Sequence, residues 1–207
     1  MSANRELRLL PLAKKRDARA SRTRARLASS LRDLMQRKPL SDISVQDVLD
    51  HARISRSAFY AHFSGKVDLL LTDLDEFLEA VATQLSRSRE QSQRVVVVAE
   101  FFAHVAQAEK IRAALARSGR LGDFYDLARP HFARSIEQRL REIPRSAHLS
   151  ALDRSGLAHT FAGALMAQLD WWLAKGQSIA AEEMDRRFHR LVWATIGRPQ
   201  PSPGHGG

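Results

Sequence analysis

The sequence predicts an all-α fold of about nine helices, with a small N-terminal helix-turn-helix domain followed by a larger C-terminal helical bundle. Three observations favour this class. Apolar side chains recur at intervals of three and four residues, the period of an amphipathic helix, along most of the chain. Residues that start helices (Ser) and residues that end them (Pro and Gly) separate the periodic segments. No pair of segments reads as two partner strands.

The composition is that of an ordinary globular protein, with 44% hydrophobic and 27% charged residues in a chain of 207. Apolar runs stay far below the ~18 residues needed to span a bilayer, so we expect no membrane association. Cysteine is absent, which excludes disulfides and thiolate chemistry and is compatible with a reducing cytosol. We therefore expect a cytoplasmic protein.

Positive charge is concentrated in the first third of the chain. Residues 1–66 hold 15 Lys and Arg against 6 Asp and Glu, whereas residues 67–207 hold 18 against 17. This asymmetry favours a nucleic-acid partner, and its alternative is a solvated basic surface or a disordered basic tail. The interpretation therefore needs a structured element that reads DNA.

The first predicted helix begins near Ser21 and ends before Pro39. Its single apolar stripe consists of Leu27, Leu31, Leu34 and Met35. Residues 1–20 precede it as a basic segment that we expect to be a flexible arm. Two alternatives remain for this arm: it reaches the phosphates or the minor groove of DNA, or it is a tail without contacts.

The second predicted helix begins at Ser44 and ends near Ala52. Ser44 and Asp47 have the spacing of a capping box, in which each side chain accepts a hydrogen bond from the other residue's backbone N–H. Ile43 and Val48 have the spacing of a hydrophobic staple. The serine cap, the acidic residue three positions later and the staple thus mark the same helix start.

The third predicted helix is short and runs from Ser55, its N-cap, to about His62. Phe59 and Phe63 supply its buried face, which leaves the polar side chains outward. Ser64 then reads as the cap of a fourth helix. Two short helices joined by three or four residues, the second with an outward polar face, are typical of a helix-turn-helix over residues 44–63.

This region resembles the DNA-binding domain of the TetR family of bacterial regulators over about Arg22 to Leu71. The resemblance is carried by Ile43-Ser44-Val45-Gln46-Asp47-Val48, by Ala52-Arg53-Ile54-Ser55-Arg56-Ser57-Ala58-Phe59-Tyr60-Ala61-His62-Phe63, and by Lys66-Val67-Asp68-Leu69-Leu70. The chain departs from the family pattern at Arg53, where the turn usually has Gly. A left-handed backbone at that position costs a non-Gly residue on the order of 1 kcal/mol.

The resemblance implies that the third helix enters the major groove. It also implies that Tyr60, His62 and Lys66 contact phosphates while Arg56 and Ser57 meet bases. The full set of expected DNA contacts is Arg22, Ser44, Val45, Gln46, Arg56, Ser57, Tyr60, His62 and Lys66. Three of these have alternatives without DNA: Tyr60 as a half-buried core aromatic, and His62 and Arg56 as ordinary exposed residues.

The C-terminal two thirds read as further helices, over about 108–116, 122–142, 150–175 and 181–196. An earlier segment, with Val95, Val98, Phe102 and Val105, also keeps the helical period. Pro130 is expected to kink or break the 122–142 helix near Arg129. We expect the domains to be the arm (1–20), the helix-turn-helix domain (21–67), a ligand-binding and dimerisation domain (68–197) and a disordered tail (198–207).

Large side chains in the bundle give two candidate sets. The candidate ligand pocket consists of Phe101, Phe102, Phe124, Tyr125, His131, Phe161, Met166 and Trp171. The candidate dimer interface, on the last two long helices, consists of Leu165, Leu169, Trp172, Phe188 and Trp193. The alternative for both sets is that they fill the core of the subunit. Gly163 lies inside one of these helices, where it costs about 1 kcal/mol relative to Ala unless another helix approaches closely.

The resemblance implies a regulator that binds a double-stranded DNA operator as a homodimer and responds to a small-molecule effector, with repression as the family's commoner outcome. No phosphate-binding glycine loop, metal-ligand spacing or catalytic motif appears, so we expect no enzyme activity, no metal and no cofactor. Two other functions stay open: non-specific DNA compaction by a helical dimer, and an enzyme with an unrecognised site in the bundle.

Overall fold

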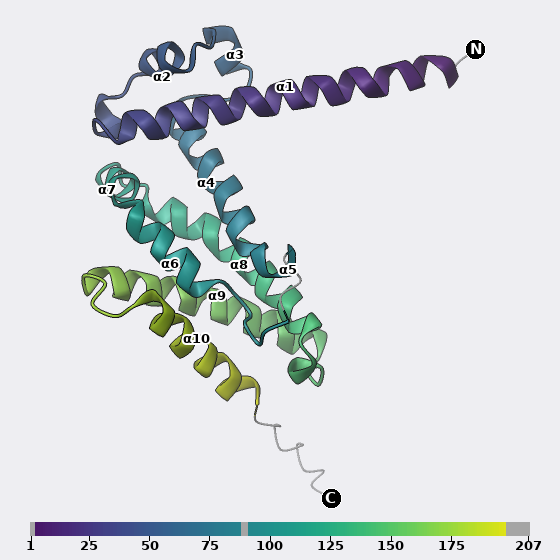
Figure 1. Cartoon of the computed structure of the whole chain (residues 1–207), viewed down its shortest axis with the longest axis vertical. Coiled ribbons are helices and arrows are strands. Elements are labelled where there is room, and N and C mark those ends of the chain that lie inside the picture. The colour runs from purple at the N-terminus through teal and green to yellow at the C-terminus, as the bar shows by residue number, and fades with distance from the viewer. Residues whose placement is uncertain (1–2, 88–90, 198–207) are drawn as a thin grey trace, which may run out of the picture. The chain divides into compact units, whose positions relative to one another are not determined.

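The protein is described by a computed structural model that covers the backbone of residues 3–87 and 91–197, with side chains from Arg19 onward. These residues form ten α-helices, two short 3-10 helices and no strand (Figure 1). The predicted all-α class is confirmed, with one helix more than the nine expected. The predicted tail, residues 198–207, lies outside the described residues.

The chain divides into two compact units. The N-terminal unit takes the residues up to Leu74 together with Lys110–Arg120, and the C-terminal unit takes Asp75–Glu109 together with the residues from Leu121. The division falls inside a helix, α4 (Lys66–Ala82), where the sequence places the boundary after residue 67. One helix is therefore shared by both units.

The N-terminal unit consists of α1 (Ala3–Met35), η1 (Leu40–Asp42), α2 (Val45–Ala52), α3 (Arg56–Tyr60) and the first half of α4. Helix α2 packs on α1 and contacts α3 (Figure 1). Apolar side chains of all these helices are buried between them, namely Leu27, Leu31, Met35, Leu40, Ile43, Val48, Leu49, Phe59, Phe63, Leu69 and Leu70. This core fixes the orientation of α3.

Helix α1 is much longer than predicted, because it begins at Ala3 instead of near Ser21. The backbone of residues 3–20 is thus helical, in the segment expected from the sequence to be a flexible arm before the first helix. This segment is rich in Ala, Leu, Arg and Lys, which are among the strongest helix formers, so its composition favours continuation of the helix.

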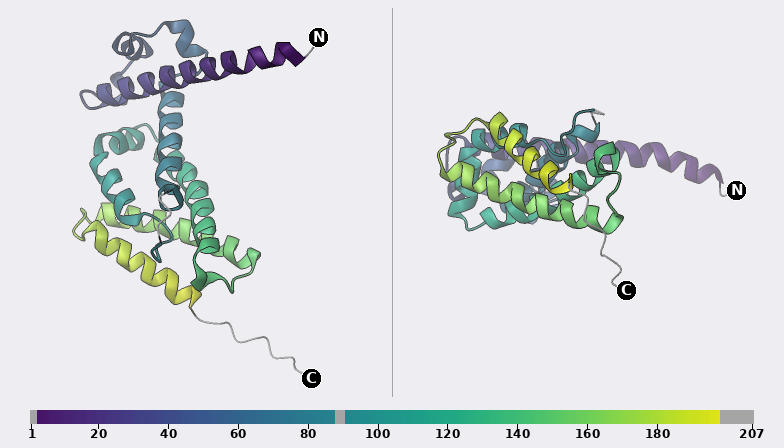
Figure 2. Two further views of the ribbon diagram at one scale, coloured as in Figure 1. Left: turned by 45° about the vertical axis from the view of Figure 1, so that its right-hand side comes forward. Right: turned by 90° about the horizontal axis from the view of Figure 1, so that it is seen from below.

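The C-terminal unit contains the rest of α4 and α5 (Gln84–Arg87), α6 (Val98–Gln107), α8 (Leu121–Glu142), η2 (Pro144–Ser146), α9 (Ala151–Ala174) and α10 (Ala181–Ile196). Helix α7 (Glu109–Arg117) falls mostly in the N-terminal unit. Helix α8 packs along α9, and α10 packs on α6 (Figure 2). The bounds of α7, α8, α9 and α10 agree with the predicted segments to within one residue.

Two details of this unit differ from the prediction. Helix α6 begins only at Val98, and Val95–Val97 precede it as a buried non-helical segment with 0% exposure. The apolar residues of Val95–Val97 are therefore explained by burial on all sides and not by a helix. Of the kink or break expected at Pro130, the break does not occur: α8 continues through this exposed proline, which removes one backbone hydrogen bond but leaves the packed face of the helix intact.

Across residues 3–87 and 91–197, every helix is too short or too polar to cross a lipid bilayer.

Candidate functional site

The predicted start of α2 is confirmed in atomic detail. Ser44 Oγ accepts a hydrogen bond from the backbone N–H of Asp47 at 3.0 Å, and Asp47 Oδ2 accepts one from the N–H of Ser44 at 2.8 Å. Lys38 Nζ also donates to Asp47 Oδ2 at 2.9 Å. The hydrogen bond from Lys38, followed by those from Ser44, lowers the pKa of Asp47 from 3.8 to about 2. This carboxylate is the anchor of the capping box.

The turn between α2 and α3 has a left-handed residue at its first position. Arg53 has φ 52° and ψ 49°. It thus adopts the left-handed conformation at the position where the family pattern usually has Gly. Its backbone N–H and that of Ile54 satisfy the last carbonyls of α2. Arg26 of α1 adds a hydrogen bond from Nη2 to the carbonyl of Ala52 at 2.6 Å. The turn therefore keeps its geometry although a side chain is present.

Helix α3 exposes the polar face that the sequence predicts. Phe59 is fully buried and makes an edge-to-face contact with Tyr60, whose side chain remains 51% exposed. Arg56 and Ser57 are exposed as well, and Ser55 caps the helix by accepting from the N–H of Ala58 at 3.3 Å. These side chains therefore share one accessible face.

A chain of hydrogen bonds joins α3, which we call the reading helix, to α2. Arg56 Nη2 donates to Gln46 Oε1 at 3.0 Å, and Gln46 Nε2 donates to Asp50 Oδ1 at 2.7 Å. All three side chains are exposed. Arginine and glutamine are the side chains that pair with guanine and adenine edges in the major groove. Two candidate base-reading groups on different helices are thus held next to each other.

Lys66 forms hydrogen bonds to the loop that precedes α2. Its ammonium donates to the backbone carbonyls of Leu40 at 2.7 Å, Ser41 at 3.2 Å and Ile43 at 2.5 Å. A lysine has three N–H donors, so all of them are used inside the protein. Lys66 therefore ties the loop before α2 to the start of α4, and its expected phosphate contact stays a prediction.

The remaining expected contacts are accessible. Arg22 and His62 are exposed, and Val45, at the first turn of α2, is partly exposed. Sequence reasoning missed Arg26, described above, and Arg32, whose guanidinium forms an ion pair with both carboxylate oxygens of Asp73 on α4. These partners lie far away in the sequence, so no local pattern could have found them.

The candidate pocket residues separate into different environments. Phe101, Phe102, Phe124, Phe161 and Met166 are at most 7% exposed. Phe101 packs against Phe124 and also against Phe132, with the ring centroids of the latter pair 4.6 Å apart. The hydroxyl of Tyr125 donates a hydrogen bond to Asp170 Oδ1, and the side chain of Trp171 is 45% exposed. The buried aromatics are thus largely core residues, because an aromatic side chain in a bundle is most stable when other rings cover it.

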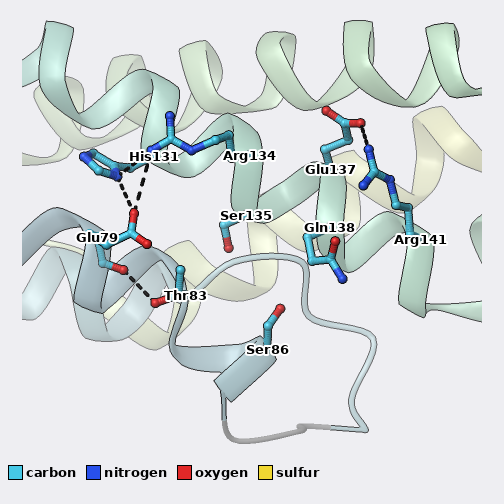
Figure 3. A pocket seen from close by; sticks show the side chains of 9 residues that line it. All are labelled: Glu79, Thr83, Ser86, His131, Arg134, Ser135, Glu137, Gln138 and Arg141. Carbon is cyan, nitrogen blue, oxygen red and sulfur yellow. Dashed lines mark hydrogen bonds and ion pairs between the residues drawn. The ribbon is translucent and has the colours of Figure 1, made fainter. Parts of the chain in front are cut away.

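His131 is the member of this set that lines a cavity, of about 420 Å³, between the end of α4, α5 and α8 (Figure 3). Its Nδ1 lies 2.7 Å from Glu79 Oε2 and its Nε2 lies 2.7 Å from Asp75 Oδ1. Arg134 Nη2 is 2.9 Å from the same Nδ1. The other residues that line the cavity have hydroxyl, amide or charged groups at the ends of their side chains, namely Thr83, Ser86, Ser135, Glu137, Gln138 and Arg141.

The candidate interface residues are all in the core of the single chain. Leu165, Leu169, Trp172, Phe188 and Trp193 are 0–7% exposed, so the interface expected from them is corrected. The largest apolar side chains of an amphipathic helix face its own bundle, and sequence alone does not separate that face from an interface. The exposed large apolar residues of the same two helices are Leu152 (83%), Trp171 (45%) and Leu191 (47%).

Within the described part of the chain, His, Asp and Glu side chains form no group of three or more that could hold a metal ion.

Comparisons with known proteins agree with this geometry. Residues 29–72 match the family model described as bacterial regulatory proteins, tetR family. Similar solved structures include the dihydroxyacetone kinase operon activator DhaS (18% identity, TM-score 0.58, 84% of this chain and 96% of that one). They also include a putative TetR-family transcriptional regulator from Syntrophomonas wolfei (18% identity, TM-score 0.55, 86% of this chain and 96% of that one). A third is a TetR transcriptional regulator from Streptococcus agalactiae (23% identity, TM-score 0.50, 87% of this chain and 98% of that one). No curated protein gives a significant match.

Proposed function

We propose that this chain is a sequence-specific DNA-binding transcription regulator, since residues 29–72 match the family model described as bacterial regulatory proteins, tetR family. The observation that carries the proposal is the exposed face of the helix-turn-helix, with Arg56 and Gln46 hydrogen-bonded to each other at 3.0 Å. Tyr60 and His62 extend this face with groups that can contact phosphates. The basic excess of residues 1–66 supplies the attraction to the DNA backbone.

We propose that the regulator acts as a homodimer on a pseudo-palindromic operator. A single short reading helix makes few base contacts, and two matched half-sites double them. The support comes from α9, which has no Asp, Glu, Lys or Arg from Ser155 to Leu169 although part of its surface is exposed. Gly163 has open space beside it, with no atom within 4 Å of where a Cβ would be. A helix of a second copy could approach closely there.

The effector site that we propose is the cavity beside His131. Its volume of about 420 Å³ suits a small molecule, and its lining residues offer a ligand both apolar surface and hydrogen-bonding groups. The cavity includes Glu79 of α4, the helix that also carries Asp73, the partner of Arg32. A ligand regulates DNA binding only if its affinity differs between the binding and non-binding arrangements of the reading domains.

The direction of regulation that we propose is repression, with the protein in the cytoplasm. A dimer bound over a promoter excludes other proteins from the same DNA. The fold also serves a protein named as an operon activator, so a reporter gene is needed to separate the two directions. Non-specific DNA compaction is the competing function, and it requires no preferred base sequence. No enzyme activity is proposed.

Selection from random DNA tests the proposal. The full-length protein is mixed with random duplexes at physiological salt, and the bound fragments are amplified and sequenced over several rounds. We expect enrichment of one pseudo-palindromic motif whose half-sites lie about one helical turn, or a small multiple of it, apart. Retention of all sequences without enrichment would support compaction and contradict the proposal.

A further inference from the structure

A second cleft, of about 680 Å³, lies in the C-terminal unit beside α10. Its walls come from one face of α10, from the residues before α6 and from the 3-10 helix η2. Four arginines line it, namely Arg94, Arg145, Arg186 and Arg190, and the acidic residue among its lining is Asp185. We call this cleft the arginine groove. It shares no lining residue with the cavity beside His131.

Two of the four arginines are neutralised by carboxylates. Arg94 Nη2 lies 2.8 Å from Asp185 Oδ1, and the same guanidinium donates to both oxygens of Glu100 at 2.9 and 2.5 Å. Arg186 Nη2 lies 2.8 Å from Glu183 Oε2. Burial raises the pKa of Asp185, but His189 and Arg94 outweigh this effect and keep it below the usual value. The carboxylate of Asp185 is therefore ionised and already paired.

The other two arginines have no carboxylate partner among the described residues. Arg145 and Arg190 form no hydrogen bond or ion pair there. The guanidinium carbon of Arg145 lies 4.9 Å from the ring centroid of Trp193, and the indole Nε1 of Trp193 donates to the carbonyl of Gln93 at 2.9 Å. Arg145 thus rests on an aromatic surface that is itself held in place.

The backbone around Arg145 also leaves room for its side chain. A Cβ on Gly197, at the end of α10, would lie 3.2 Å from Arg145 Nη2 and 2.8 Å from the carbonyl oxygen of Trp193. Arg190 precedes Trp193 by three residues and follows Arg186 by four, so these side chains lie on one face of the helix. The groove therefore presents two uncompensated guanidinium groups beside a fixed indole.

We propose that the arginine groove binds a small molecule through an oxyanion group, a phosphate or a carboxylate, held by Arg145 and Arg190. A guanidinium offers two parallel N–H donors that match two oxygens of such a group, and it keeps its charge at every physiological pH. The volume of the cleft lies in the range of small-molecule sites. All of its residues belong to the C-terminal unit, so the binding of such a molecule can be measured without DNA.

Calorimetric titration in a low-salt buffer free of phosphate tests this site, with inorganic pyrophosphate and citrate as separate probes and no DNA present. We expect at least one probe to bind the wild-type protein. Arg145→Gln and Arg190→Gln should each weaken that binding by about tenfold, the loss expected for a charge-assisted hydrogen bond. The stronger probe identifies the phosphate or the carboxylate as the preferred group.

The matched control is Arg187→Gln, which removes an exposed arginine of the same helix that does not line the groove. Circular dichroism checks that each variant keeps its helices. Undetectable binding of both probes to the wild type would overturn the proposal, and so would an equal loss in the Arg187 variant, because that result indicates general attraction of anions to a basic protein. Loss of DNA affinity in the Arg145 and Arg190 variants, with probe binding retained, would reassign the two residues to a DNA contact.

Discussion

Arg56 of the reading helix donates a hydrogen bond to Gln46 of α2 over 3.0 Å, although both side chains are exposed to solvent. The bond orders two long side chains before DNA arrives, so less conformational entropy is lost when they meet base edges. It also links the two helices of the motif at the surface that faces the major groove in our proposal. The first prediction follows from this pair.

Arg56→Ala should weaken binding to the selected operator by roughly 1–3 kcal/mol and relax the preference at one base position. Binding of random DNA should change little, because the lost contact reads a base. Fluorescence anisotropy with the operator and with a scrambled duplex measures both. An equal loss on the two duplexes would instead identify Arg56 as a phosphate contact. Ser178→Ala, an exposed loop substitution in the C-terminal unit, is the control.

Lys66→Met should lower the free energy of unfolding of the N-terminal unit by about 1–3 kcal/mol, because three backbone carbonyls lose a charged donor. In the folded protein the salt dependence of DNA binding should stay unchanged, since the ammonium is used internally. Chemical denaturation and binding at several salt concentrations test the two halves. Lys175→Met removes an exposed lysine as the control. A stable variant whose salt slope falls by about one would identify Lys66 as a phosphate contact.

Asp47 makes the helix-turn-helix sensitive to acid. Its pKa is lowered from 3.8 to about 2 in the folded protein, so the folded state binds its proton less readily than the unfolded chain does. The stabilisation is complete above pH 3.8 and is lost as the pH falls toward 2. Denaturation curves between pH 5 and 2 should therefore show a loss of stability that is smaller in Asp47→Asn. The exposed Asp33→Asn should behave like the wild type, and identical curves for all three proteins would contradict the role of Asp47.

Gly163→Arg should convert the proposed dimer to a monomer with unchanged helical content. The side chain has open space within the subunit but would fill the close approach that we propose for a second copy. Gly122→Arg is the matched control, because Gly122 also has no atom within 4 Å of a Cβ and lies near the start of α8. Light scattering and circular dichroism measure mass and folding. A Gly163→Arg protein that remains dimeric would exclude this face of α9, and a monomeric wild type would exclude the dimer.

Sequence reasoning predicted the starts of α2 and α3 correctly because helix capping is local: Ser44, Asp47 and Ser55 act on backbone groups within three residues. It predicted the fold class because the apolar period records burial. It missed the acceptors of Lys66, because they lie 23 to 26 residues earlier in the chain. It also failed for Leu169 and Phe188, since core and interface positions select the same residue types, and only their fully buried side chains separate the two.

The cavity beside His131 was beyond sequence reasoning for a related reason. Large aromatic residues were expected to line a pocket, and His131 alone of that set borders this one. Its neighbours Thr83, Ser135 and Gln138 are ordinary surface residue types in the sequence. Only the packing of α8 against the end of α4 and α5 brings them to one cavity. The composition of the chain and the spacing of its apolar residues do not predict which helices pack against each other.

The ratio of affinities for the selected operator and for a scrambled duplex of the same length and composition tests the central claim most directly. Both are measured with the full-length protein at one physiological salt concentration, because electrostatic attraction alone changes steeply with salt. A sequence-specific regulator should bind the operator at least about 10³-fold more tightly than the scrambled duplex. A ratio near one, with strong and salt-dependent binding to both duplexes, would contradict the claim and leave compaction as the function.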